Sequence, residues 1–378
     1  MDLQAYGWNG KIWNGRFGEQ KKKGNLIMRK FNLKKIAAFV LAGTMAIGMS
    51  ATVFAADLSG KALEDKTKFT KTFTTDNDTY HPAATFTFTK PTGAAPTNDE
   101  KVSGIPVSNG EEGPDVTLGN AEFKAATTTT GSETADVSIT YGDLTNVVPG
   151  VYKYSFSEVE SANTNIKCDT TTKYLYVFVA LDNEGKKTIT GASMTNGTSK
   201  VPGITNEYGK DKDNKDTLHD LTITKDITGA MANMNETFTF KVKVTSADKK
   251  AKYKVVVTRK GEVDSKITSI DTNTETSINN IGKGDSIKIY SLAKDDSYTV
   301  EEVRANTNGY TAKINGKADE DGKINGKVAD ADVEVKYDNN KEAVTPTGII
   351  MNYAPYIAML AAACALAVVF FNRRREDA

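Results

Sequence analysis

The sequence predicts an all-β protein built from two tandem β-sandwiches, and three observations support this prediction. Short runs such as Tyr152–Phe156 and Tyr174–Val179 alternate apolar and polar side chains, which is the period of strands with one buried face. Clusters of glycine, asparagine and aspartate separate these runs, for example at Asp182–Gly185. No convincing amphipathic helix is present between them. Many short strands joined by frequent turns are typical of β-sandwiches.

The N-terminal end contains two segments that precede the sandwiches. A basic start, an apolar run at 36–49 and small residues at 53–56 follow one another, as in a secretory signal peptide. We therefore expect residues 28–55 to be removed on export. Residues 1–27 are polar and do not fit this layout, so we interpret them as an over-extended start, with Met28 as the true initiator.

The segment between the two ends contains the same series of landmarks twice. They are, first copy and then second, Phe69–Phe73 and Ile223–Ile227, Thr85–Phe88 and Thr237–Phe240, Tyr154–Glu158 and Tyr298–Glu302, and Ile204–Asn206 and Tyr337–Asn339. Four landmarks in one order indicate a duplicated domain, at 56–208 and 219–343. The charged segment 209–218 joins them. Its aspartates are spaced somewhat like a calcium loop but lack the glycine and glutamate of an EF-hand, so we expect a solvated linker and no metal.

Each copy places a lysine and a glutamate on an apolar strand face. Alternation puts Lys71 and Lys225 beside the apolar residues that flank them, and it puts Glu158 and Glu302 on the face of the tyrosine four residues earlier. A buried salt bridge would explain either pair alone. The recurrence of the pair, with an asparagine ending each copy, favours chemistry, because desolvation lowers the pKa of lysine and raises that of glutamate.

A neutral amine is a nucleophile, and a protonated carboxyl can polarise the asparagine side-chain carbonyl. Attack of the amine on the asparagine Cγ, with the glutamate shuttling protons, would release ammonia and leave a Lys–Asn isopeptide bond. This reaction occurs once and without turnover, so it does not make the protein an enzyme.

These residues resemble the streptococcal-type pilin isopeptide-linkage domains of sortase-assembled backbone pilins in Gram-positive bacteria. The resemblance covers residues 60–348 and implies two immunoglobulin-like, CnaB-type sandwiches in tandem. It assigns crosslinking roles to Lys71, Glu158 and Asn206 in the first copy and to Lys225, Glu302 and Asn339 in the second. Glu301 and Asn340 stay open as alternatives, although alternation favours Glu302 and the shared apolar-x-Asn pattern favours Asn339.

Cysteine usage agrees with such a covalent tie. Cys364 lies in the C-terminal apolar run, which leaves Cys168 alone in the mature chain and excludes an intramolecular disulfide. An exported protein without disulfides needs another protection against unfolding. A bond between first and last strands would close nearly a whole domain into one loop.

The C-terminal segment 344–378 resembles an LPxTG-type cell-wall sorting signal. Val-Thr-Pro-Thr-Gly precedes the apolar run 349–371, which is long enough to cross a bilayer, and three arginines follow it. Sortases cleave such signals between the threonine and the glycine, here Thr347 and Gly348. We expect Pro346 and Gly348 to keep that bond outside the anchor helix. An ordinary C-terminal membrane anchor is the alternative.

The resemblance also implies partners. A pilin sortase (class B or C type) would join Thr347 to a lysine of the next copy, and a housekeeping sortase would attach the polymer to peptidoglycan; accessory pilins are further possible partners. The acceptor must be exposed, and Lys200, shortly before Asn206, is our candidate among many lysines. The expected location is a wall-anchored surface pilus, reached through a transient membrane-anchored precursor.

Charge and composition exclude other classes. The net charge is zero, but residues 56–347 hold 36 basic and 44 acidic residues, which argues against nucleic-acid binding. His81 and His219 belong to no ligand or nucleophile cluster, and no cofactor motif is present. A monomeric wall-anchored adhesin on the same scaffold is the second hypothesis, for which Pro91–Gly119 could be a binding loop or merely a variable insertion. Covalent ladders on cells would distinguish the two.

Overall fold

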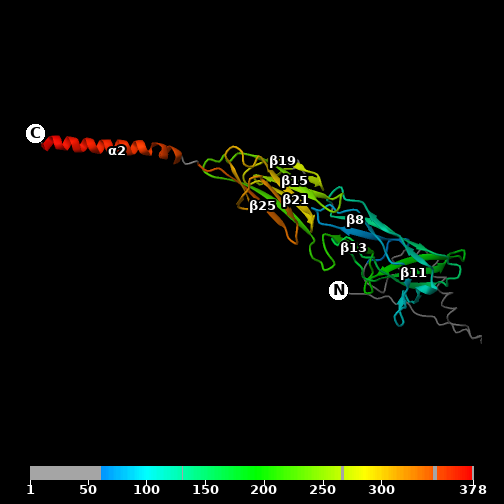
Figure 1. The fold of residues 1–378 in the computed structure, drawn as a ribbon. Helices are drawn as coiled ribbons and strands as arrows, with labels where there is room; N and C mark the ends of the chain where they lie inside the picture. The colour runs from blue at the N-terminus through cyan, green and yellow to red at the C-terminus, as the bar shows by residue number, and fades with distance from the viewer. Residues whose placement is uncertain (1–60, 130, 265–267, 344–346, 377–378) are drawn as a thin grey trace, which may run out of the picture.

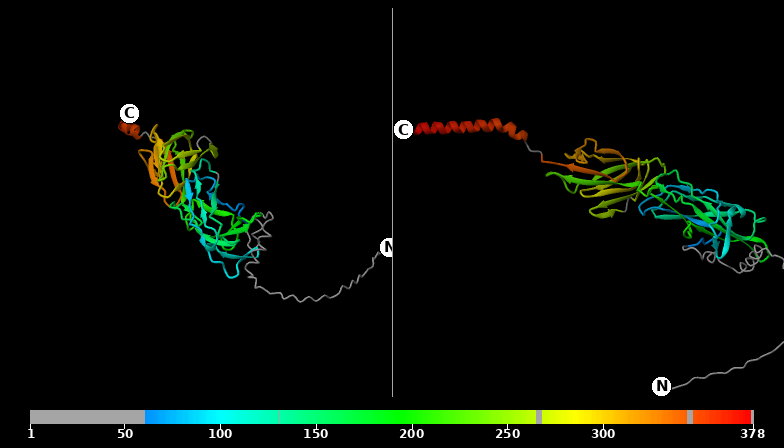
Figure 2. Two further views of the ribbon diagram at one scale, coloured as in Figure 1. Left: turned by 90° about the vertical axis from the view of Figure 1, so that its right-hand side faces the viewer. Right: turned by 90° about the horizontal axis from the view of Figure 1, so that it is seen from below.

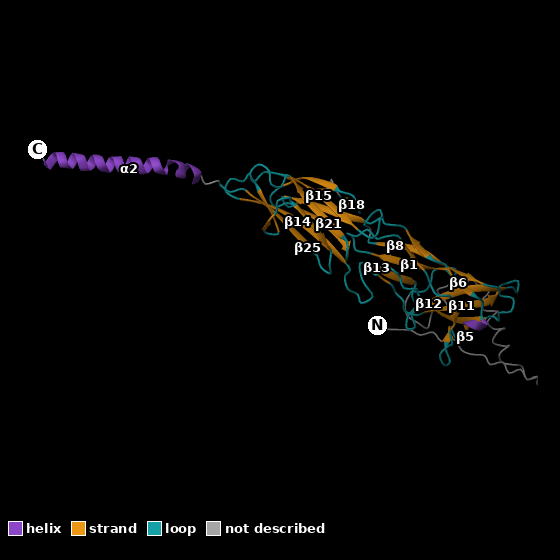
Figure 3. Ribbon diagram, viewed as in Figure 1, coloured by secondary structure: helices purple, strands orange, loops and turns teal. Residues whose placement is uncertain are grey.

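The computed structural model describes residues 61–129, 131–264, 268–343 and 347–376. Two β-sandwiches follow one another end to end, and a helix extends beyond the second, as the three views agree (Figures 1 and 2). Strands make up nearly all of the regular structure in both sandwiches (Figure 3), so the predicted all-β class is confirmed. The expected signal peptide and the residues before it lie outside the described residues.

The first sandwich packs two main sheets around one apolar core. Their strand orders are β10-β13-β1-β8-β6 and β12-β11-β9-β5-β4, with β3 beside β9 and a separate pair β2-β7. The elements are β1 (Lys68–Thr74), β2 (Ala84–Phe86), β3 (Thr92–Gly93), β4 (Lys101–Val102), β5 (Ile105–Asn109), the short helix η2 (Gly110–Glu112), β6 (Val116–Leu118), β7 (Ala121–Phe123), β8 (Ser132–Tyr141), β9 (Gly150–Phe156), β10 (Ile166–Lys167), β11 (Lys173–Leu181), β12 (Lys187–Thr195) and β13 (Gly203–Tyr208).

The second sandwich repeats this plan with its own core. Its sheets are β17-β16-β20-β14-β25-β22-β23, with β18 beside β16, and β19-β15-β21-β24. The strands are β14 (Leu218–Thr228), β15 (Phe238–Thr245), β16 (Lys252–Arg259), β17 (Glu262–Asp264), β18 (Ser269–Asp271), β19 (Thr276–Ile281), β20 (Ser286–Ala293), β21 (Ser297–Val303), β22 (Thr311–Ile314), β23 (Lys317–Ala318), β24 (Lys323–Lys327) and β25 (Val333–Asn340).

The first and last strands of each sandwich are parallel neighbours. On β1 and β13 Phe73 is opposite Asn206, and on β14 and β25 Ile227 is opposite Asn339. The lysine of each copy lies two residues before Phe73 or Ile227. Because side chains alternate between the two faces of a strand, it lies on the same face as the asparagine opposite. The topology therefore brings the predicted lysine and asparagine of each copy to one place.

The segment Pro91–Gly119 folds onto the first sandwich. β5 adds to β9 as a parallel strand, and a small apolar cluster forms beneath it from Val107, Val151, Tyr176 and Phe178. Beside this cluster Lys153 donates to Glu100 at 2.9 Å. The segment thus covers the outer face of a sheet.

The two sandwiches contact each other beside the linker. After β1, Asp78 accepts a hydrogen bond from Lys254 at 2.5 Å, and Thr79 bonds to Ser291 of the second sandwich. Within the linker, Asp211 accepts from the backbone N–H groups of Asp213 and Lys215. Its carboxylate stabilises a turn of the backbone, in keeping with a solvated linker.

The C-terminal helix α2 (Thr347–Glu376) coincides with the expected apolar run, and its large apolar side chains from Tyr356 to Phe371 are exposed. Among the residues that the structure describes, no helix meets the criteria of length and hydropathy for a membrane span. The helix begins at Thr347, so the expectation that the Thr347–Gly348 bond lies outside it is wrong. This bond belongs to the first turn, whose N–H groups have no partner within the helix, so the turn opens at little cost.

Candidate crosslinking sites

The predicted residues of the first sandwich meet in its core. Lys71 on β1, Glu158 after β9 and Asn206 on β13 are at most 3% exposed. Lys71 Nζ donates to Glu158 Oε2 at 2.7 Å, and Asn206 Nδ2 donates to Glu158 Oε1. One carboxylate therefore binds the amine on one oxygen and the amide nitrogen on the other. This arrangement can take a proton from the nucleophile and give one to the leaving group.

An aromatic ring lies under the lysine and isolates it from water. The Phe86 ring centroid is 4.7 Å from Lys71 Nζ, within cation–π range. Burial lowers the pKa of Lys71, and the neighbouring Glu158 opposes this shift in part. The lowered pKa increases the share of neutral amine, which is the nucleophilic form.

The second sandwich holds the corresponding trio. Lys225 Nζ is 3.5 Å from Glu302 Oε1, and Asn339 Nδ2 donates to the same oxygen at 2.7 Å. The Phe238 ring centroid is 4.4 Å from Lys225 Nζ. Burial lowers the pKa of Lys225 to about 8 and raises that of Glu302. Both directions favour the pair of neutral amine and protonated carboxyl that the reaction needs.

The structure distinguishes Glu302 from Glu301 and Asn339 from Asn340, the alternatives between which the sequence did not decide. Glu302 is 1% exposed and bonds to Asn339, which is fully buried. Glu301 keeps 31% of its side chain exposed and contacts Lys323 at 3.8 Å. Asn340 donates to Thr228 at 3.0 Å, outside the core. Of these neighbours, Glu302 and Asn339 are therefore the two that lie in the core with Lys225.

The two sites differ at the asparagine oxygen. Asn206 Oδ1 accepts a hydrogen bond from the backbone N–H of Asp169 at 3.0 Å. Asn339 Oδ1 and Glu302 Oε2 are both buried, and neither has a hydrogen-bond partner among the residues that the structure describes. A half-turn of the Asn339 amide would bring its oxygen to the carboxyl, where a protonated Glu302 could donate to it.

Sequence reasoning missed several of these contacts. Phe86 and Phe238 occupy the same position in the repeated Thr-Phe-Thr-Phe tetrapeptide, so the repeat itself could have identified the ring beneath each lysine. Cys168, whose sulfur is 3.4 Å from Asn206 Nδ2, and Asp169 follow β10 and belong to no repeated pattern. No local signal in the sequence places them at the site.

The proposed acceptor Lys200 is 8% exposed. A bridge to Thr195 holds it in a turn where Asn196 accepts from the N–H groups of Thr198 and Ser199. The exposure expected of an acceptor is therefore not met in this conformation, and transfer to Lys200 would require the turn to open.

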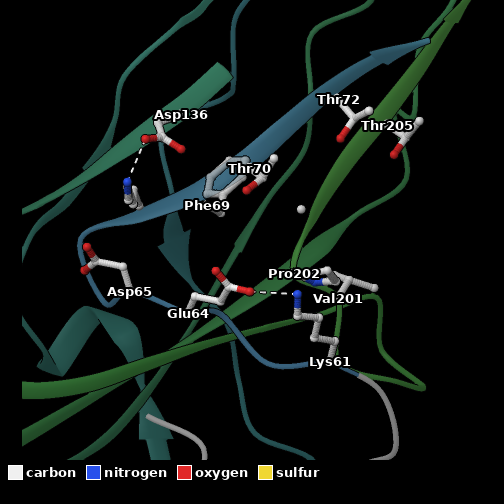
Figure 4. Close-up of a pocket in the computed structure, with 12 residues that line it drawn as sticks. Lys61, Glu64, Asp65, Phe69, Thr70, Thr72, Asp136, Val201, Pro202 and Thr205 are labelled. Carbon is white, nitrogen blue, oxygen red and sulfur yellow. Dashed lines mark hydrogen bonds and ion pairs between the residues drawn. The ribbon is translucent and has the colours of Figure 1, made fainter. Parts of the chain in front are cut away.

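A groove lies nearby, where β1 and β13 begin (Figure 4). Its volume is about 400 Å³, and Val201, Pro202 and Thr205 contribute to its lining. Lys61 and Lys68 also line it, with 67% and 47% of their side chains exposed. Each is paired with a carboxylate: Lys61 with Glu64 (Figure 4), and Lys68 with Asp136. Both are accessible amines in a groove that Val201, next to the predicted acceptor, also lines.

Of the predicted sortase residues, Pro346 lies outside the described residues, whereas Thr347 and Gly348 begin α2. The lysine and glutamate of each trio are buried, as the alternation of side chains predicted, and the asparagine of each trio is buried beside them.

Comparisons with known proteins found one family model and two relatives. A family model described as a domain of unknown function (DUF7601) matches residues 219–341. A pilin of Streptococcus pyogenes serotype M1 is 25% identical over 260 residues, which cover 65% of this chain and 73% of the pilin. The pilus tip adhesin Cpa of the same species is 30% identical over 131 residues, 35% of this chain and 18% of the adhesin.

Among solved structures, the major pilin from S. pyogenes has a TM-score of 0.48 at 20% identity, covering 74% of this chain and all of the pilin chain. The major pilin protein T3.2 from S. pyogenes serotype GAS13637 has a TM-score of 0.47 at 20% identity, covering 73% of this chain and 99% of the pilin chain. The pilin relatives are structural proteins, in agreement with the expectation that this protein is not a turnover enzyme. The sequence comparison thus shows that the chain is homologous to streptococcal pilin.

Proposed function

We propose that this protein is the structural subunit of a covalent cell-surface pilus, and that each of its sandwiches is closed by a Lys–Asn isopeptide bond. The homologous pilin and pilus adhesin support a pilus subunit. The observation that carries the crosslinks is the pair of buried Lys–Glu–Asn trios on parallel first and last strands.

The reaction needs no external reagent. In the first sandwich, Lys71 passes a proton to Glu158 and its free amine attacks Asn206 Cγ. The C–N bond to Nδ2 breaks, the carboxyl returns a proton to that nitrogen, and ammonia leaves. A new amide joins Nζ to Cγ. Its nitrogen gives its second proton to Glu158, which therefore ends protonated. Lys225, Glu302 and Asn339 react in the same way.

The strand order gives the bonds a mechanical role. β13 leads through the linker into β14, and β25 leads toward the C-terminus. A pull along the chain would enter the second sandwich on β14 and leave it on β25. A bond between Lys225 and Asn339 would carry that load directly between the two strands, so the sandwich would not unfold under tension.

Polymerisation follows from the C-terminal signal. A pilin sortase would cleave between Thr347 and Gly348 and transfer the threonine carbonyl to a lysine of the next copy. Lys200 remains the proposed acceptor because it lies just before β13, at the end of that strand opposite to the linker. A housekeeping sortase would anchor the last copy to peptidoglycan. The transient precursor would stay in the membrane through residues 349–371.

Intact-protein mass on residues 56–347 tests the crosslinks. The unaltered chain should be lighter than its translated sequence by two ammonia molecules, and Lys71→Ala and Glu302→Ala should each restore one. Glu301→Ala is the matched control and should keep both losses. A mass equal to the translated sequence would reduce both trios to buried ion pairs.

A position at the pilus tip is the second candidate, favoured by the similarity to the tip adhesin Cpa over 131 residues. A tip subunit has no successor beyond it. Immunoblots of cells that express the unaltered chain would show ladders of multimers for a shaft subunit and a single added band for a tip subunit.

A further inference from the structure

We infer that the backbone N–H of Asp169 is the oxyanion donor for crosslinking in the first sandwich, and that Lys173 and Thr171 are positioning residues for it. This inference rests on the proposed isopeptide reaction and adds a new part to it. When an amine attacks Asn206 Cγ, negative charge develops on Oδ1. A donor already aimed at that oxygen stabilises the transition state.

The register of β10 and β13 explains why this N–H is available. Their ladder pairs Ile166 with Tyr208 and Lys167 with Glu207, and it ends there. Cys168 would be the next residue, opposite Asn206, but the chain turns away instead. The N–H of Asp169 then has no strand partner and donates to the Asn206 side chain at 3.0 Å.

The buried side chain of Lys173 holds this turn in place. Lys173 is 2% exposed, and its Nζ donates to both carboxylate oxygens of Asp169 at 2.9 and 2.8 Å. The Thr171 hydroxyl donates to the same carboxylate at 2.5 Å, and the Thr171 N–H does so at 3.2 Å. Four donated bonds hold Asp169 by its side chain, so its backbone N–H keeps one direction.

The arrangement also orients the amide. With Oδ1 held by Asp169, the nitrogen of Asn206 faces Glu158, which can protonate it as it leaves. A surface cavity of about 530 Å³ borders the turn, and Cys168, Asp169 and Thr171 contribute to its lining. Ammonia released beside Cys168 therefore has a short way to solvent.

The second sandwich lacks this donor for a visible reason. The strand beside β25 is β22, and its ladder continues past the reactive asparagine, pairing Ala312 with Asn339 and Thr311 with Asn340. The ladder leaves no turn beside Asn339, and within the described part of the chain Asn339 Oδ1 accepts no hydrogen bond. The second crosslink of the same chain therefore forms without this donor, which makes it an internal control for the first.

The test follows both crosslinks in the mature chain after a short pulse of cell-free synthesis. Samples are quenched in acid at intervals and digested, and the peptides joined through Lys71–Asn206 and through Lys225–Asn339 are quantified by mass spectrometry. The variants are Lys173→Met, which releases Asp169, Lys173→Arg, which keeps the charge, and the milder Asp169→Asn. Lys153→Met is the matched control, because it breaks another buried lysine–carboxylate pair of the same sandwich, with Glu100, away from the trio.

We expect Lys173→Met to slow the first crosslink about tenfold or more, since complete loss of an oxyanion donor costs roughly 10²–10³-fold. The second crosslink should keep its rate. Asp169→Asn should give an intermediate rate, and Lys173→Arg should recover most of it. The rate against pH should keep its shape in the Lys173 variants, which leave Asp169 charged. Asp169→Asn removes a carboxylate that raises the pKa of Lys71, so its rate should rise at a lower pH.

An unaltered first-crosslink rate in Lys173→Met would overturn the inference. Equal slowing by Lys153→Met would do the same, because general loosening of the sandwich would then explain the effect. If the unaltered chain forms no first crosslink, the proposed reaction itself fails, and the inference fails with it.

Discussion

Lys71 on the first strand and Asn206 on the last strand belong to one parallel ladder, in which Asn206 lies opposite Phe73, two residues beyond the lysine. Both side chains are buried, and Glu158 contacts each of them. Lys225 and Asn339 repeat the relationship across β14 and β25. A bond within either ladder would close a loop of more than a hundred residues, which makes its effect on stability measurable.

The first prediction concerns that stability. Asn206→Ala prevents the first crosslink and should lower the free energy of unfolding of the first sandwich by about 4–5 kcal/mol, the value for closing a loop of this length. Calorimetry of residues 56–347 should show one transition moving to lower temperature. The transition of the second sandwich is the control. Unchanged transitions would mean that no bond closes the first loop.

The second prediction concerns the choice between neighbouring residues. Asn339→Ala should abolish one ammonia loss, because Asn339 is fully buried against Glu302. Asn340→Ala should keep both losses, because Asn340 bonds to Thr228 and Glu342 away from the core. Intact mass reads the difference directly. The opposite result would move the reactive site to Asn340 and require a shift in the register of β25.

Alternation along single strands was enough to predict the class of fold and the inward direction of Lys71, Glu158, Lys225 and Glu302. Because the side-chain period of a strand is two, one apolar neighbour on each side determines the face. The asparagines followed from the repeat, since each ends a copy of it.

Features that depend on pairing between distant segments could not be predicted in this way. The contact of Asp169 with Asn206 depends on where the β10–β13 ladder ends, and the pairing of Lys153 with Glu100 depends on β5 joining β9. The exposure of Lys200 likewise depends on its turn. The sequence around Thr347 correctly indicated a helix but not its first residue, because helix boundaries carry weak local signals.

The third prediction concerns the acceptor lysine. Lys200→Arg keeps the charge but removes the primary amine, so it should abolish covalent ladders on cells that carry the pilin sortase. Immunoblots of wall extracts would show this result. Since Lys200 is 8% exposed, transfer should also become faster when its turn is loosened by Asn196→Ala, which removes the bonds to Thr198 and Ser199.

Lys61→Arg and Lys68→Arg are the controls for this experiment. Both residues are exposed in the groove beside β1 and β13, and both variants should keep the ladder. Loss of the ladder in one of them, with Lys200→Arg unaffected, would make the groove lysine the acceptor and would explain why Lys200 is buried.

The fourth prediction concerns pH. In the reactive state of the second sandwich the carboxyl is protonated and the amine is neutral. In the ion pair the same proton lies on the amine instead, so the two states hold equal numbers of protons. Burial raises the pKa of Glu302 and lowers that of Lys225 to about 8. Below the raised pKa of Glu302 a second proton binds, and the amine stays charged. Above about 8 the last proton is lost, and the carboxyl can no longer donate.

The rate of the second crosslink should therefore be highest between these two values and should fall on both sides. Pulse synthesis into buffers of different pH, followed by peptide mass analysis, measures this profile. Glu302→Gln cannot exchange the proton and should form no bond at any pH, whereas Glu301→Gln should keep the full profile. A rate that rises steadily through pH 8 would show that neutral Lys225 alone is sufficient, and it would remove Glu302 from the role of proton donor.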